Sequence, residues 1–140
     1  MKNVPLKEVM VSPVVTVHRK DPFSAVEEKF RRKGIRHLPV IDDDGVLVGL
    51  VTQRDLYRTI SPHVTDEGPY YDPEILNHFV LRHVMTKDPV TLAPEDPMSK
   101  AIEIMTRRKF SCIPVVDRNK KVVGIVTEID VLRFVGQHLF

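Results

Sequence analysis

The sequence lacks several features that would place it in a specialised class of protein. Its single cysteine, Cys112, excludes an intramolecular disulfide and a four-cysteine zinc site. No apolar run approaches the roughly 20 residues that a membrane-spanning helix needs. The residues that follow Met1 do not form the apolar core of a signal peptide. We therefore expect a cytoplasmic protein with no membrane partner.

An excess of charge of one sign is also lacking. The 21 basic and 19 acidic side chains leave a formal net charge of +2, which gives no whole-chain argument for binding nucleic acid. Six glycines and 11 prolines in 140 residues are too few for a fibrous or low-complexity chain. The length and the hydrophobic fraction of 42% are those of one ordinary globular domain.

What the sequence does contain is an internal repeat. Residues 9–57 align without gaps on residues 84–132, at a constant shift of 75 positions. Val9-Met10 matches Val84-Met85, and many further positions are identical, far more than chance would give. The chain therefore carries two copies of one unit. We place the first copy at residues 1–60, a connector at 61–78 and the second copy at 79–140.

Each copy predicts the element order β-α-β-β-α. Aspartates at 21 and 96, each followed by proline, are predicted to be helix N-caps with proline at the first helical position. Apolar residues recur at helical spacing after them, and two nearly continuous apolar strands follow around a polar turn. The predicted strands are residues 14–17, 38–41, 46–51, 89–92, 113–116 and 122–126. In the connector, residues 61–72 are predicted to be loop and residues 73–83 helix.

The most informative string ends both copies: glycine, two apolar residues, threonine, any two residues and aspartate. It runs from Gly49 to Asp55 and from Gly124 to Asp130. Glycine lets a ligand or another backbone approach closely, and a helix start binds phosphate well. The aspartate could accept hydrogen bonds from a ribose diol. The same pattern is also a helix capping box, and both roles can coexist.

The duplicated unit resembles a tandem pair of CBS domains, also called a Bateman module. The resemblance covers essentially the whole chain and includes the string Ile35-Arg36-His37-Leu38-Pro39-Val40. It implies an α/β (α+β) fold in which two β-α-β-β-α repeats pack as a pseudo-two-fold pair. It also implies two clefts between the repeats, which in many family members bind adenosine nucleotides or related adenosyl ligands. Family members commonly pair into flat dimers.

The resemblance assigns residues to each cleft. In the first cleft, Asp130 would bind the ribose and Thr127 would lie near phosphate. Val9 and Ile35 would flank the base, and Arg36 and His37 would reach the phosphates. In the second, Asp55 and Thr52 would take these roles, with Val84, Phe110, Ser111, Cys112 and, in partial compensation for charge, Arg54. The apolar residues Ile125, Ile129 and Leu50 complete the nucleotide-binding set. Since Arg36 is cationic and Ser111 is neutral, we expect the Asp130 cleft to favour a polyphosphate.

Other signals are weaker. The six histidines show no zinc spacing, and residues 42–45 lack the ligand spacing of a calcium loop, so no metal is predicted. Cys112 lies in an apolar strand and reads as a small buried hydrophobe rather than a nucleophile. The basic run 29–37 is typical of a solvated helix end, without the aromatic platform that single-stranded nucleic acid would use.

These observations favour a non-enzymatic, stand-alone regulatory module. Its expected ligand is AMP, ADP or ATP, or alternatively S-adenosylmethionine, with no required cofactor. The last helix is apolar over more than one stripe, which predicts a homodimer, and an unidentified regulated protein would sense the ligand-dependent orientation of the modules. Two alternatives stay open: a ligand-free dimerisation scaffold and a nucleic-acid-binding regulator.

Overall fold

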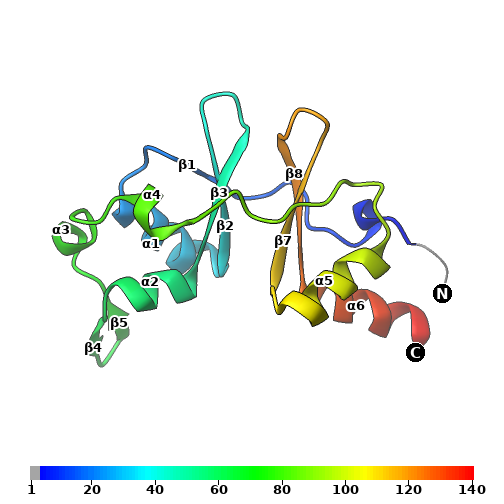
Figure 1. Ribbon diagram of the computed structural model, residues 1–140. Helices are drawn as coiled ribbons and strands as arrows, with labels where there is room; N and C mark the ends of the chain where they lie inside the picture. Colours follow the sequence, from blue (N-terminus) through cyan, green and yellow to red (C-terminus); the bar gives the residue numbers. More distant parts are fainter. Residues whose placement is uncertain (1–3) are drawn as a thin grey trace. The chain divides into compact units, whose positions relative to one another are not determined.

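The computed structural model of this chain describes residues 4–140, which divide into two units (Figure 1). The N-terminal unit contains residues 15–43 and 48–88, and the C-terminal unit contains residues 4–14, 44–47 and 89–140. The division does not follow chain order, because the segment that opens each copy packs with the other copy. Within residues 4–140, no helix combines the length and the apolar character that crossing a bilayer would require.

The N-terminal unit is built on a four-stranded sheet of order β1-β2-β3-β6. Its strands are β1 (Val17–His18), β2 (His37–Ile41), β3 (Leu47–Thr52) and β6 (Thr86–Lys87). β1 pairs parallel with β2, and β6 pairs antiparallel with β3. The helices are α1 (Phe23–Lys33), α2 (Gln53–Thr59), α3 (Pro73–Leu76) and α4 (Leu81–Val84). The fully buried Phe23, Leu38 and Val51 lie in one apolar core with Leu81.

The C-terminal unit is built on the antiparallel pair β7 (Cys112–Val116) and β8 (Val122–Thr127). Helices α5 (Met98–Arg108) and α6 (Glu128–Leu139) lie side by side and contact each other (Figure 1). A 3-10 turn at Leu6–Glu8 precedes Val11, which bridges antiparallel to Ile125. Leu6 is fully buried in a core that includes Ile113 and Val126.

The copies therefore exchange their opening segments. Residues 4–11 begin the first copy but pack on β8 and α5 of the second, while Leu81 and β6 pack on the first copy. Leu6 donates its N–H to the carbonyl of Asp96 at 2.9 Å, and Met98 donates to the carbonyl of Val4 at 2.7 Å. Each short copy thus completes its apolar core with residues of the other, as a unit of about 60 residues needs to do.

The predicted N-caps are wrong. Helices α1 and α5 begin after Pro22 and Pro97, which are the N-cap residues and have an extended backbone. Neither helix is capped by a hydrogen bond to its N-cap side chain. Instead, the Asp21 carboxylate accepts from the N–H of His18 at 2.9 Å, and Asp96 accepts from Ala93 at 2.7 Å. Both aspartates therefore close the turn before the helix, which is the other common use of a short acidic side chain.

The connector contains more regular structure than predicted. β4 (His63–Thr65) and β5 (Gly68–Tyr70) form an antiparallel hairpin where loop was expected, and the hairpin extends away from the sheet below α2 (Figure 1). Gly68 has a φ of +110°, a conformation that side chains disfavour, so it permits the tight turn. The predicted helix 73–83 is split into α3 and α4. The first strand of the first copy is also shorter and later than predicted.

Candidate functional site

The two threonine–aspartate strings form complete capping boxes. Thr127 donates its N–H to Asp130 Oδ2 at 2.8 Å, and its Oγ1 accepts from the N–H of Asp130 at 3.4 Å. Thr52 and Asp55 make the same pair of bonds at 2.8 and 3.1 Å. The capping interpretation is thereby confirmed in both copies. It also fixes each carboxylate rigidly at the end of a buried strand, where a ligand would meet a preorganised acceptor.

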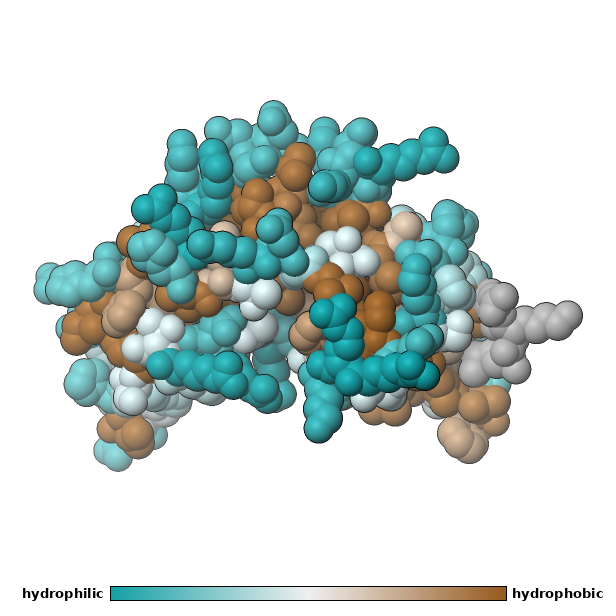
Figure 2. All heavy atoms as spheres, in the orientation of Figure 1, coloured by the Kyte–Doolittle hydropathy of each residue, from teal (hydrophilic) through white to brown (hydrophobic). Residues whose placement is uncertain are grey.

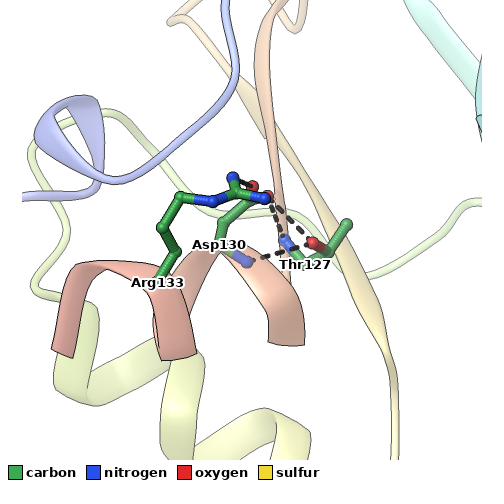
Figure 3. Close-up of polar contacts among 3 residues, drawn as sticks. All are labelled: Thr127, Asp130 and Arg133. Atoms are coloured by element: carbon green, nitrogen blue, oxygen red, sulfur yellow. Dashed lines mark hydrogen bonds and ion pairs between the residues drawn. The ribbon is translucent and has the colours of Figure 1, made fainter. Parts of the chain in front are cut away.

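The two aspartates differ in their surroundings. Asp130 is only 6% exposed, receives a further bond from Thr127 Oγ1 at 2.9 Å and forms an ion pair with Arg133 at 3.4 Å (Figure 3). Asp55 is only partly buried. Arg58 is its counterpart to Arg133, but in the described part of the chain no ion pair joins Arg58 to Asp55. Among residues 4–140, the Asp55 carboxylate is thus held only by the capping box, in which Oδ2 accepts from the N–H of Thr52.

The start of β2 and the start of β7 each lie directly beside the capping box of their own copy. Cys112 is the register partner of Thr127, and the carbonyl of Ser111 accepts from the N–H of Glu128 at 3.2 Å. In the N-terminal unit, the carbonyl of Arg36 accepts from the N–H of Gln53 at 2.9 Å. Within each unit, the fold therefore brings the predicted phosphate-side residues next to a threonine.

Cys112 is buried at this corner, and its environment decides its chemistry. Burial and, to a lesser extent, the nearby Asp130 carboxylate raise the pKa of its thiol far above the ordinary value. The thiol therefore stays protonated at neutral pH and has little nucleophilic character. The Cys112 side chain therefore serves as a small buried apolar group beside Thr127. Within residues 4–140, no group of three histidine, cysteine or acidic side chains is arranged to hold a metal ion.

The predicted base-side residues also divide between the units. Val9 is buried in the C-terminal core, and Val11, two residues on, exchanges hydrogen bonds of 2.9 and 3.1 Å with Ile125. In the N-terminal unit, Leu50 is the register partner of Thr86, which follows Val84 closely in sequence. Each opening segment thus runs beside the strand that leads to a threonine–aspartate box.

The glycine that opens each string is explained by a methionine. A methyl group at Gly124 would overlap Sδ of Met10, and one at Gly49 would overlap Sδ of Met85. In both units this methionine comes from the exchanged opening segment. A side chain of the other copy, rather than another backbone, therefore makes the close approach at these glycines, and it ties the opening segment to the strand.

The remaining predicted residues lie at the surface of their own units. Arg54 is exposed, Ile129 is 60% exposed on α6, and Phe110 lies under the Arg108 guanidinium at 5.0 Å. Ile35 packs partly on the N-terminal core, next to His37 at the start of β2. Each predicted cleft draws on both units, so its assembly stays a prediction.

Sequence reasoning missed Arg133, Met10 and Met85 as parts of these corners. A signal for the first was present, because Arg58 and Arg133 are identical at the same shift of 75, one position beyond the aligned stretch. The methionines were visible as repeated residues, but their contact with glycine is long-range and has no local signature.

The family model that matches this chain is the CBS domain, at residues 6–62 and 81–137. A CBS domain-containing protein of Dictyostelium discoideum is 28% identical over 91% of this chain and 88% of that protein. A homoserine O-acetyltransferase of Methanohalobium evestigatum is 30% identical over 94% of this chain but only 24% of its own length. The chain thus spans about a quarter of the length of several curated relatives that it matches.

Solved structures with the same fold carry adenosyl ligands. The CBS domain pair of protein MJ0100, in complex with 5′-methylthioadenosine and S-adenosyl-L-methionine, superposes with a TM-score of 0.80 at 25% identity, over 97% of this chain and 98% of that one. CBSX2 in complex with AMP superposes with a TM-score of 0.79 at 26% identity, over the same shares. The two family matches, the mixed α and β units and these neighbours agree: the chain is a pair of CBS domains and belongs to the CBS-domain family.

Proposed function

We propose that this chain is a regulatory module that binds an adenosyl ligand, such as AMP, ADP, ATP or S-adenosylmethionine, at its threonine–aspartate boxes. The observation that carries the proposal is the presence of a complete box in each unit, at the end of a buried strand. The adenosyl complexes of two structural neighbours support the ligand class. The residues supply recognition only, and the proposed module performs no bond-making chemistry of its own.

The capping box leaves the carboxylate able to accept more hydrogen bonds. A carboxylate has about four acceptor positions, and the box and hydroxyl of Thr127 converge on Oδ2 of Asp130. Among residues 4–140, Oδ1 has the Arg133 guanidinium as its partner, at the long distance of 3.4 Å. A ribose diol would therefore donate to Oδ1, beside the Arg133 guanidinium.

The proposed clefts are unequal. Arg36 is exposed and forms no salt bridge with any described residue, so its guanidinium is available for a phosphate in the cleft that it would share with Asp130. Ser111 and Cys112 offer only neutral groups to the cleft of Asp55. We therefore propose that the Asp130 cleft takes the polyphosphate and that Val9 and Ile35 flank its base.

Ligand binding becomes a signal through a shift in population. A ligand held by residues of both units has a higher affinity for one arrangement of those units than for others, and it stabilises that arrangement by this difference alone. A second protein chain would then distinguish the two states. The proposed module resides in the cytoplasm and needs no bound metal.

The proposed assembly is a homodimer through α6. Its exposed side includes Ile129, Leu132, Leu139 and Phe140, each more than half exposed. Apolar surface is visible at the C-terminal end of this helix in Figure 2. Leu132→Glu should place a charge in the interface and raise the dimer dissociation constant in sedimentation equilibrium, whereas Gln137→Glu on the same helix should not. Equal behaviour of both variants would contradict the use of this face.

Calorimetric titration of the intact chain with AMP, ADP, ATP and S-adenosylmethionine tests the ligand. Asp130→Asn keeps an oxygen for the capping box but replaces a charged acceptor, whose hydrogen bond contributes roughly 1.5–3 kcal/mol, by a neutral one that contributes about 0.5–1.5 kcal/mol, so affinity should fall about tenfold. Asp55→Asn is the matched control in the other box and should weaken polyphosphate binding less. Failure of all four ligands to bind folded protein would overturn the proposal.

Two rival functions have their own readouts. A ligand-free scaffold would show no absorbance at 260 nm from nucleotide released by denaturing the purified protein, and no titration heat. A nucleic-acid-binding regulator would show affinity for any DNA or RNA that falls steeply with salt, because phosphate neutralisation releases counterions. The proposal expects neither pattern.

A further inference from the structure

The N-terminal unit contains a pocket of about 640 Å³ that lies apart from its threonine–aspartate box. The pocket lies between the turn that follows β1 and the segment that leads into α4, two neighbouring parts of the unit (Figure 1). None of its lining residues belongs to the predicted nucleotide-binding set. Its volume falls in the range of small-molecule sites, roughly 300–1,000 Å³.

Three of the residues that line the pocket are basic. Arg19, Lys20 and Arg82 line it together with a single acidic residue, Asp21. In residues 4–140 no salt bridge neutralises these three cations, and Oδ2 of Asp21 already accepts from the N–H of His18 at 2.9 Å. The Asp43 carboxylate, which feels the charges of Arg19 and Lys20, is itself paired with His18. The pocket therefore has a formal excess of two positive charges.

The pocket is also lined by apolar side chains and an aromatic ring. Val48, Phe79 and Met85 line the pocket, and Phe79 is 36% exposed. The ring of Phe79 packs edge-on against Phe23, with 6.5 Å between centroids and 64° between planes. Phe23 is fully buried, so this contact holds the Phe79 ring in place. A rigid ring in a pocket with basic side chains suits a ligand with an aromatic or apolar body and an anionic group.

The C-terminal unit has backbone hydrogen bonds at the positions equivalent to this pocket. At the equivalent positions, Lys7 donates its N–H to the carbonyl of Pro94 at 3.0 Å, next to the Leu6–Asp96 and Met98–Val4 bonds. Its side chain also forms a salt bridge of 3.3 Å with Glu95. No matching backbone bonds join residues 79–82 to residues 19–23 among those described. Among residues 4–140, the N-terminal unit thus lacks these backbone bonds between the opening segment and its turn, and the contacts there include Ser24 N–H donating to Asn77 Oδ1 at 3.0 Å and the Phe79–Phe23 ring contact.

We infer that the pocket of the N-terminal unit binds a small organic phosphate monoester with an apolar or aromatic body. A phosphate monoester carries about −1.5 to −2 charges at pH 7, which matches the excess of two positive charges. Two guanidinium groups and an ammonium suit its oxygens, and Phe79 and Met85 contact the organic part. The ligand would bridge the turn after β1 and the opening segment, as hydrogen bonds do in the C-terminal unit.

Titration of the intact chain with phenyl phosphate, followed by amide NMR, tests this inference. Amide signals of residues 19–22 and 79–82 should shift. The double variant Arg19→Gln/Arg82→Gln should weaken binding at least about tenfold, because charge-assisted hydrogen bonds contribute roughly 1.5–3 kcal/mol. Phe79→Ala should weaken binding of phenyl phosphate but leave binding of inorganic phosphate unchanged. Lys7→Gln, at the position of the C-terminal unit that is equivalent to Arg82, should have no effect on binding of phenyl phosphate.

The result is separable from that of the nucleotide proposal. Asp130→Asn and Asp55→Asn should retain phenyl phosphate binding, whatever they do to adenosyl ligands. Absence of shifts in the folded wild-type chain, shifts confined to other residues, or equal affinity in the Arg19→Gln/Arg82→Gln variant would each overturn the inference. Equal losses of phenyl phosphate and inorganic phosphate in Phe79→Ala would overturn the assignment of an apolar body.

Discussion

The N-terminal and C-terminal units are built from the same repeat, yet they close differently. In the C-terminal unit the opening segment is bonded to the turn before α5, and a Lys7–Glu95 salt bridge covers the join. In the N-terminal unit two cations, Arg19 and Lys20, occupy the positions of Pro94 and Glu95 and line a pocket, and among residues 4–140 the equivalent backbone bonds are absent. The strands and helices are therefore alike in the two copies. A few side chains at equivalent positions determine whether the opening segment is hydrogen-bonded to the turn before the helix.

The largest expected effect concerns a contact that both units share. Gly124→Val should destabilise the chain by about 1–3 kcal/mol, because its side chain would overlap Met10 in a packed core. Gly49→Val should have a similar cost against Met85. The free energy of unfolding in urea measures both.

Double-mutant cycles provide the control. Met10→Ala should reduce the cost of Gly124→Val but not that of Gly49→Val, and Met85→Ala should do the reverse. If the costs were unchanged in all four combinations, the methionine contacts would not explain the glycines.

The capping boxes should differ between the units. Thr52→Ala removes a cap and should cost about 1 kcal/mol. Thr127→Ala should cost more, since it also removes the 2.9 Å hydroxyl bond to the buried Asp130 carboxylate. Urea unfolding gives both values, with Thr52→Ser and Thr127→Ser as controls that keep the hydroxyl. A greater loss at Thr52 would reverse this comparison.

A matched pair at the helix ends should have effects of opposite sign. Gly34 after α1 has a φ of 63°, and its counterpart Lys109 after α5 has a φ of 57°. Lys109→Gly should raise the free energy of unfolding by about 0.5–1 kcal/mol. This is the cost of placing a side chain in the left-handed conformation, minus the larger conformational entropy that glycine loses on folding. Gly34→Lys should destabilise by a similar amount. Thermal unfolding would contradict this account if both changes had the same sign.

The smallest effect is a pH dependence confined to the N-terminal unit. His18 bonds Asp43, and this bond with the histidine charge lowers the pKa of that carboxyl below its ordinary value of 3.8. The bond therefore stabilises the fold above pH 3.8, and the stabilisation is lost as pH falls through the lower folded pKa. The carboxyl carbon of Asp43 should titrate below 3.8 by NMR, and His18→Ala should raise this midpoint, because it removes the largest cause of the lowered pKa. An unchanged midpoint would contradict the pairing. The C-terminal unit has Ala93 and Arg118 at these positions and cannot form the pair.

Much of the fold could be predicted because its signals are local. The repeat, the paired apolar strands and the helices after Thr52 and Thr127 follow from periodicity and spacing, and the resemblance to a CBS pair is confirmed. The capping boxes were predicted correctly as one reading of the pattern, since a box depends on residues only three apart. The roles of Asp21 and Asp96 were wrong, because an aspartate before a helix can bond either the helix or its own turn.

What could not be predicted depends on contacts between distant parts of the chain. No local pattern tells that Leu6 completes the core of the second copy, or that Met10 meets Gly124. The pocket beside Phe79 is likewise lined by residues far apart in the sequence, from Arg19 to Met85. The membership of each nucleotide cleft stays a prediction for the same reason, because it requires residues of both units.

Amide NMR of the intact chain titrated with AMP tests the central claim most directly. The account predicts saturable shifts centred on Thr127, Asp130, Thr52 and Asp55, lost at Asp130 in the Asp130→Asn variant while the rest of the spectrum stays that of a folded chain. Shifts that avoid both threonine–aspartate boxes, or shifts at these boxes that persist unchanged when Asp130 and Asp55 are both replaced by asparagine, would contradict it.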